Sequence, residues 1–172
     1  MKDGFHSRKD DICAKIRLEK ESARNLTKGA IRMKKILVTT DGSDNSERAL
    51  NEVKKLGELM DAELTILTVL DPIAMLGYSY PELSERDTSI LRNAGEYVLD
   101  EALKLMDDFK GEIKTKLKHG SPADEILKEA ENGDYDIIVM GSRGIGIFSR
   151  GMLGSVSNKV LNHTETNVFI VK

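Results

Sequence analysis

Ile137-Ile138-Val139-Met140, an apolar run, leads directly into Gly141-Ser142-Arg143-Gly144, and Gly154-Ser155 follows after nine further residues. The apolar run predicts a buried strand, and the small residues predict a turn that a bulky anion can approach closely. Glycine tolerates positive φ, so the N–H groups of such a turn can point toward a phosphate oxygen. Gly154-Ser155 predicts the start of a helix, whose first N–H groups lie unpaired at the positive end of its dipole. A phosphate-bearing ligand is therefore the first hypothesis.

Alternating strand and helix signals extend from this stretch in both directions. Strands are expected over residues 36–39, 64–70, 112–118, 135–140 and 168–171. Helices are expected over residues 44–60, 84–109, 121–133 and 155–163. This alternation predicts an α/β fold with a doubly wound, open, five-stranded parallel sheet and helices on both faces. We expect the strand order 3-2-1-4-5, with the strand over 112–118 nearer an edge because its apolar and polar residues alternate.

Local signals at the helix ends refine these bounds. Asp44 and Glu47 have the spacing of a capping box at the start of the first helix. Ser121-Pro122-Ala123-Asp124 predicts another helix start, with a capping serine and proline at the first position. Asp71-Pro72 is expected to end the second strand, and residues 73–83 to form a connection.

Length and composition exclude several classes of protein. The chain has 172 residues, of which 40% are hydrophobic and 5% aromatic, and its net charge is −3. These values favour one domain with an appendage, and no apolar run is long enough to span a membrane. One cysteine, Cys13, excludes an internal disulfide framework and favours a cytoplasmic location. Residues 33–172 carry 17 basic and 24 acidic residues, which argues against nucleic acid as a partner.

The chain is predicted to divide at its second methionine-led start. Met33-Lys34-Lys35 leads straight into the first strand signal, so residues 33–172 are expected to form the domain. Residues 1–32 contain nine basic and five acidic residues with weak helical periodicity. We interpret them as an N-terminal extension: an upstream start, a tag, or an accessory helix that packs on a partner.

Two turns far apart in the sequence are predicted to meet. Thr39-Thr40-Asp41-Gly42-Ser43 leaves the first strand, and residues 141–155 leave the fourth. In the expected strand order these strands flank the switch point, where ligands bind in open α/β sheets. Asp41 fits both a site at this point and an ordinary turn, because aspartate before glycine is a common turn residue.

Residues 33–172 resemble the universal stress protein family. The resemblance rests on the segments 34–43, Gly120-Ser121-Pro122 and 136–142, and on the spacing of Gly141, Gly144 and Gly154-Ser155, which is that of the family's nucleotide-binding branch. It implies a Rossmann-like fold of the adenine nucleotide alpha hydrolase type and ATP with Mg²⁺ as cofactors. Asn167 stands where a proline often precedes the last strand.

The resemblance also implies the residues that would hold the nucleotide. These are Thr40, Asp41, Val69, Met140, Gly141, Ser142, Arg143, Gly144, Gly154, Ser155 and Val156. It puts Asp41 near the ribose, the main chain of Val69 at the adenine edge, and Ser155 at the triphosphate. From the residues alone, Val69 is an ordinary core valine. Arg150 and Lys159 also lie near the loop and are candidates to offset phosphate charge.

Other chemistries have weaker support in the sequence. The glycine loop lacks the Gly-Lys-Ser/Thr of a Walker A motif, and His6, His119 and His163 show no metal-ligand spacing. No activated nucleophile or general base is apparent. The leading hypothesis is an ATP-binding stress-response protein in which the nucleotide acts as a switch toward an unknown protein partner. A slow ATPase or adenylyl-transfer enzyme and a nucleotide-free dimeric module remain as alternatives. A homodimer is expected through the apolar residues 168–171.

Overall fold

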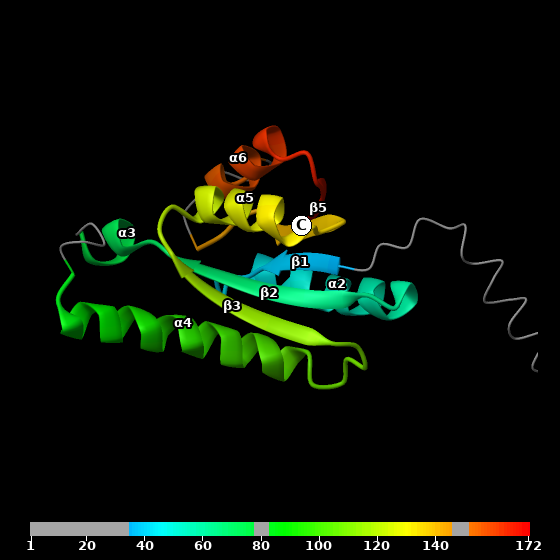
Figure 1. Ribbon diagram of the computed structural model, residues 1–172, viewed down its shortest axis with the longest axis horizontal. Helices are drawn as coiled ribbons and strands as arrows, with labels where there is room; N and C mark the ends of the chain where they lie inside the picture. The colour runs from blue at the N-terminus through cyan, green and yellow to red at the C-terminus, as the bar shows by residue number, and fades with distance from the viewer. Residues whose placement is uncertain (1–34, 78–82, 146–151) are drawn as a thin grey trace, which may run out of the picture. The chain divides into compact units, whose positions relative to one another are not determined.

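A single parallel sheet organises the computed structural model, which describes residues 35–77, 83–145 and 152–172 (Figure 1). Its strands are β1 (Lys35–Thr39), β2 (Glu63–Leu70), β3 (Ile113–His119), β4 (Ile137–Gly141) and β5 (Asn167–Val171). They lie in the order β3-β2-β1-β4-β5, and every neighbouring pair is parallel. The predicted fold class and strand order are confirmed. Residues 1–32, predicted to be an extension, lie outside the described residues.

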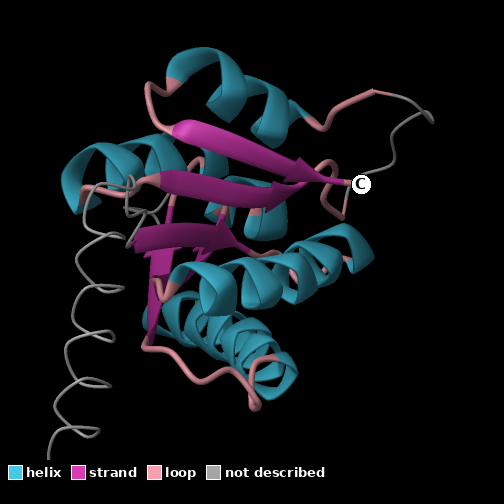
Figure 2. Cartoon of the chain, turned by 90° about the vertical axis from the view of Figure 1, so that its right-hand side faces the viewer, coloured by secondary structure: helices cyan, strands magenta, loops and turns pink. Residues whose placement is uncertain are grey.

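Helices cover both faces of the sheet (Figure 2). They are α2 (Asp44–Met60), α3 (Pro72–Leu76), α4 (Glu85–Leu105), α5 (Pro122–Gly133) and α6 (Ser155–His163). The side chains of α2 and α4 pack on one face, and those of α5 and α6 pack on the other. No helix in the described part of the chain is long and apolar enough to cross a membrane.

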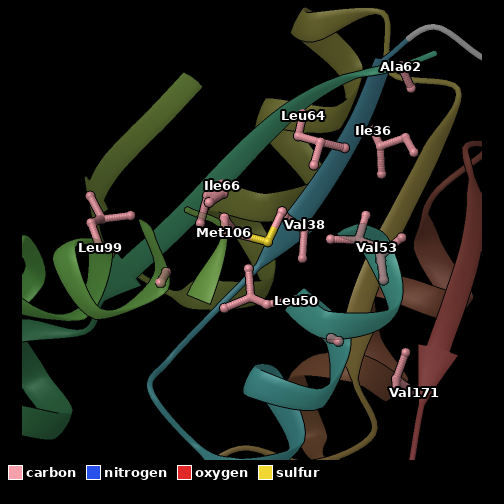
Figure 3. Close-up of a cluster of buried hydrophobic side chains, with 13 residues drawn as sticks. Ile36, Val38, Leu50, Val53, Ala62, Leu64, Ile66, Leu99, Met106 and Val171 are labelled. Carbon is pink, nitrogen blue, oxygen red and sulfur yellow. The ribbon is translucent and has the colours of Figure 1, made fainter. Parts of the chain in front are cut away.

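The core on the α2 and α4 face follows from the two-residue period of the strands. Ile36 and Val38 of β1 point to this face and are fully buried, while Leu37 between them points to the other. Leu50 and Val53 of α2 pack over the β1 side chains, and Met106 lies beside Val38 and Ile66 (Figure 3). This core packs beneath β1 and β4, whose carboxyl ends lead into the two turns described below.

Three local predictions are wrong, and a fourth is incomplete. Ser43, not Asp44, caps α2, and its side chain accepts a hydrogen bond from the N–H of Ser46. Asp71-Pro72 ends β2 as predicted, but the connection after it contains the short helix α3, because the Asp71 carboxylate caps the N–H groups of Ile73 and Ala74. Helix α4 stops at Leu105 instead of continuing to residue 109. The Ser121 side chain makes no capping bond. Hydrogen bonds from Lys159 and, to a smaller extent, from Ser121 instead lower the pKa of the Asp124 carboxyl.

Candidate functional site

A cavity of about 250 Å³ opens at the carboxyl ends of β1 and β4. These strands are direct neighbours, with Val38 opposite Val139, so the turns that follow them emerge side by side. The cavity is lined by Thr39, Thr40, Asp41, Ser46, Leu67, Val69, Pro122, Ile126, Met140, Gly141, Arg143, Gly144, Ile145, Gly154, Ser155, Val156 and Ser157. Asp41 and Ser155, 114 positions apart in the sequence, thus share one hollow.

The lining combines an apolar wall with polar groups. Leu67, Met140 and Ile126 are buried and belong to the core beneath α5 and α6, so they give the cavity a firm apolar wall. Asp41 and Arg143 contribute one carboxylate and one guanidinium, and Ser155 contributes a hydroxyl. A ligand with a flat apolar part and an anionic part suits such a lining.

The turn after β1 is held in place by hydrogen bonds to its neighbours. The N–H of Thr40 donates to the carbonyl of Leu67 at 3.0 Å, and the Thr68 hydroxyl donates to the carbonyl of Thr40 at 3.2 Å. The Thr40 hydroxyl bonds the buried Ser46 hydroxyl at 3.1 Å. Thr40 is therefore committed to the protein through both its main chain and its side chain.

Asp41 joins this turn to the one after β4. Its Oδ1 accepts from the N–H and the hydroxyl of Ser43, at 3.1 and 2.6 Å. Its Oδ2 accepts from the N–H of Ile145 at 3.1 Å. One carboxylate thus bridges the two turns that form the cavity.

The three glycines of the motif serve close approach and not positive φ. Among the described residues, the glycines with positive φ are Gly42, Gly77 and Gly120. The prediction that the glycines of the motif adopt positive φ is therefore wrong. A Cβ on Gly141 would lie 2.8 Å from the carbonyl carbon of Asn45. A Cβ on Gly144 would overlap Oδ2 of Asp41, and one on Gly154 would lie 3.3 Å from Cα of Arg143.

Helix α6 begins at the cavity without a side-chain cap. Its N-cap is Gly154, and its first intrahelical bond runs from the N–H of Asn158 to the carbonyl of Gly154. Within the described chain, the N–H groups of residues 155–157 have no hydrogen-bond acceptor. These donors front the cavity at the positive end of the helix, which suits an anion.

The domain that carries this cavity matches a known protein family. The family model of the universal stress protein family matches residues 33–172. The chain belongs to the universal stress protein family. Universal stress protein YxiE of Bacillus subtilis is 35% identical over 150 residues, which are 80% of this chain and 98% of that protein.

Solved structures of the universal stress protein family share the fold. That of UspA from Lactobacillus plantarum has a TM-score of 0.71 at 26% identity, and covers 82% of this chain and 99% of its own. A universal stress protein solved in complex with cAMP has a TM-score of 0.59 at 25% identity. That match covers 81% of this chain and 96% of the other.

Ten of the eleven residues that the family resemblance implied line the cavity. The exception is Ser142, which is 3% exposed and lies behind the lining, with a buried hydroxyl that has no hydrogen-bond partner among the described residues. Its main chain is nevertheless engaged, since its N–H donates to the carbonyl of Val171 and its carbonyl accepts from the N–H of Gly154. Ser142 thus supports the loop from the side of β5.

Seven lining residues of this universal stress protein were not among the predicted site residues, although Thr39 and Ile145 belong to the two turns that were predicted to meet. The seven are Thr39, Ser46, Leu67, Pro122, Ile126, Ile145 and Ser157. The strand period offered a signal for Leu67, which lies two residues before Val69 and shares its face. Pro122 was predicted only as a helix start, and Ile126 has no local signal, because α5 reaches the cavity only through the packing of the whole sheet.

The cations near the loop differ in their availability. Arg143 lines the cavity. Lys159 instead pairs with Asp124 of α5, with 2.6 Å between Nζ and Oδ1, and this bond lowers the pKa of the Asp124 carboxyl. Lys159 is thus engaged by α5 and is not among the described lining residues, so its candidate role toward phosphate stays a prediction. Arg150 lies outside the described residues. The ion pair ties α5 to α6, whose first turns both border the cavity.

Proposed function

We propose that this universal stress protein binds ATP in the cavity between the turns after β1 and β4, and that occupancy acts as a switch in a stress response. The observation that carries the proposal is the uncapped start of α6 opening into a hollow that also has a firm apolar wall. The complex of a related universal stress protein with cAMP supports an adenine nucleotide as the ligand class.

Each part of the nucleotide has a counterpart in the lining. The apolar wall with Leu67 and Ile126 suits the base, and the main chain of Val69 offers groups for its polar edge. The phosphates suit the N–H groups of residues 155–157, the Ser155 hydroxyl and the Arg143 guanidinium. Gly144 and Gly154 leave room for the phosphates to reach the main chain.

Mg²⁺ enters this proposal with the nucleotide. Among the described residues no group of three His, Cys, Asp or Glu side chains could hold a metal ion. Magnesium in nucleotide sites is commonly held by phosphates with one or two carboxylates. Asp41 is the single carboxylate in the described lining, so phosphate and water oxygens would supply most of the ligands of the ion.

A switch fits the described lining better than rapid catalysis does. Hydrolysis needs a group that activates water, and the single carboxylate there already accepts three hydrogen bonds from the protein. The loop also has a direct route to the sheet edge: the Ser142 carbonyl accepts from Gly154, and the Ser142 N–H donates to Val171 of β5. Occupancy at α6 would thereby alter the edge strand that a partner can meet.

Calorimetric titration with ATP and Mg²⁺ tests the proposal, and one variant sharpens it. Ser155→Asp places a negative charge at the start of α6, which suits the helix but repels a phosphate. We expect ATP affinity to fall about tenfold, a Coulomb cost of roughly 1.4 kcal/mol, while thermal stability is kept. The control Asn158→Asp adds the same charge one turn further along, outside the lining, and should bind ATP normally.

Two outcomes would contradict nucleotide binding at this cavity. One is the absence of both binding heat and thermal stabilisation at millimolar ATP with the unmodified chain. The other is an equal loss of affinity in Ser155→Asp and Asn158→Asp, which would mean that total charge matters and the start of α6 does not.

We also infer a homodimer through β5. Its edge carries Phe169, whose side chain is 44% exposed, between Val168 and Ile170. The opposite edge strand, β3, carries Lys114, Lys116 and Lys118, and lysines on an edge strand disfavour pairing. The contrast between the two edges favours association through β5.

The dimer has its own prediction. Phe169→Lys should convert a dimer at micromolar concentration into a monomer in analytical ultracentrifugation, because it puts a charge into the paired edge. Tyr97→Lys is the matched control, since Tyr97 is an exposed aromatic residue of α4, and this helix packs against β2 and β3 at the other end of the sheet. A monomeric unmodified chain, or a Phe169→Lys variant that stays dimeric, would exclude β5 as the interface.

A further inference from the structure

The two carboxylate oxygens of Asp41 bind different turns of the cavity. Oδ1 is used inside its own turn, where it accepts from the N–H and the hydroxyl of Ser43. Oδ2 is used across the cavity, where it accepts from the N–H of Ile145, 104 positions away in the sequence. The two oxygens therefore have different partners on different turns.

Gly144 provides an independent sign that the second turn is shaped around this carboxylate. A Cβ at position 144 would overlap Oδ2 of Asp41, and within 4 Å the described residues other than its chain neighbours offer it only atoms of Asp41. The absence of a side chain there thus serves the approach of Asp41 specifically. Gly144 thus leaves room for Oδ2 of Asp41, and the N–H of Ile145 donates a hydrogen bond to it.

We propose that Asp41 is a positioning residue, which fastens the turn after β4 to the turn after β1 so that the cavity is formed before a ligand enters. A carboxylate has about four acceptor positions, and protein donors fill three of them. A ligand can therefore donate one hydrogen bond to Asp41. This last point rests on the proposed nucleotide function, whereas the fastening of the turns does not.

The chemistry of an amide side chain separates fastening from simple charge. The substitution Asp41→Asn leaves one acceptor group and one donor group in place of two acceptors. If the amide oxygen faced Ser43, the NH₂ group would face the N–H of Ile145, and the reverse orientation would oppose the N–H of Ser43. Asp41→Asn therefore loses a contact in either orientation, without a change of size.

Amide hydrogen exchange of Ile145, followed by NMR on the nucleotide-free protein, tests the fastening directly. Asp41→Asn should speed exchange at Ile145 about tenfold or more, the factor for a lost hydrogen bond to a charged group. Asp44→Asn is the matched control: it removes an exposed carboxylate three residues away and should leave Ile145 unchanged. Equal exchange at Ile145 in the unmodified chain and in Asp41→Asn would overturn the proposal.

Gly144→Ala supplies a second, independent perturbation. It keeps the charge of Asp41 but forces the carboxylate away from Ile145. Exchange at Ile145 should rise as in Asp41→Asn, and the double variant should exchange no faster than either single one, because both remove the same bond. Additive effects of the two substitutions would contradict a shared contact.

The same samples distinguish this proposal from the nucleotide function. Faster exchange in Asp41→Asn together with no ATP binding by the unmodified chain would retain the fastening and reject the nucleotide. ATP binding by the unmodified chain together with unchanged exchange in Asp41→Asn would retain the nucleotide and reject the fastening. If both hold, Asp41→Asn should also weaken ATP binding, because the cavity is no longer formed in advance.

Discussion

Gly141→Ala is expected to lower the free energy of unfolding by about 3 kcal/mol, although it adds a single methyl group. That methyl would lie 2.8 Å from the carbonyl carbon and 2.9 Å from the carbonyl oxygen of Asn45. Both atoms belong to the backbone of the first turn of α2, so no side-chain rotation relieves the overlap. Either β4 or α2 must shift, and both are fixed in the buried core that contains Val53 and Val139.

Gly154→Ala is the matched control, because it makes the same chemical change at another glycine of the same motif. Its methyl would lie 3.3 Å from Cα of Arg143, and that residue belongs to a loop and not to the core. We expect a loss of about 1 kcal/mol, much of it from replacing a glycine N-cap by alanine. Urea unfolding measures both values, and equal losses at the two positions would contradict the packing role of Gly141.

The two glycines illustrate how far the motif could be predicted from the sequence. Its spacing placed a turn and a helix start correctly, since Gly154 caps α6 and Ser155 begins it. The spacing could not tell that Gly141 meets the backbone of α2, because that contact depends on the parallel pairing of β1 and β4. The motif therefore predicts that a side chain is not tolerated at position 141, but it does not predict that the backbone of Asn45 is the neighbour that excludes it.

The strands and long helices were predictable because their signals are local. Buried runs such as Leu64 to Leu70 and the caps at Ser84 and Gly154 act within a few residues. Asp71-Pro72 fits both the end of a strand and the start of a helix, and the structure shows both, because the course of the following chain decides whether a helix forms. The pairing of Lys159 with Asp124 joins two helices and has no local signal at all.

A buried carboxylate on α5 gives the second large effect expected in this protein. Glu129 is 5% exposed, and its side chain accepts from Lys116 at 2.5 Å, Lys118 at 2.8 Å and the Tyr135 hydroxyl at 2.9 Å. These contacts fasten α5 to β3 and to the connection that leads into β4. The same helix supplies Pro122 and Ile126 to the cavity wall, so Glu129 holds one side of the candidate site from behind.

Glu129→Ala is expected to lower the free energy of unfolding by about 3 kcal/mol, the lower end of the cost of breaking a buried ion pair. The lower end applies because Lys116 and Lys118 still reach water once their partner is lost, with side chains 43% and 28% exposed. Glu131→Ala is the control, since Glu131 is an exposed glutamate of the same helix. A loss at Glu129 no greater than that at Glu131 would show that the cluster contributes no net stability.

The pH dependence of unfolding separates the charge of Glu129 from its shape. Burial acts to raise the pKa of the Glu129 carboxyl, but hydrogen bonds from Lys116, Lys118 and Tyr135 outweigh it and hold the pKa below its ordinary value. The unfolded chain then binds this proton more tightly than the folded one. The stabilisation is therefore complete above the unfolded pKa, about 4.3, and is lost as the pH falls through the lower folded pKa.

Glu129→Gln should be less stable than the unmodified chain at pH 7, and the difference should shrink in acid. A difference that stays constant down to the acid transition would mean that Glu129 contributes by its shape and not by its charge.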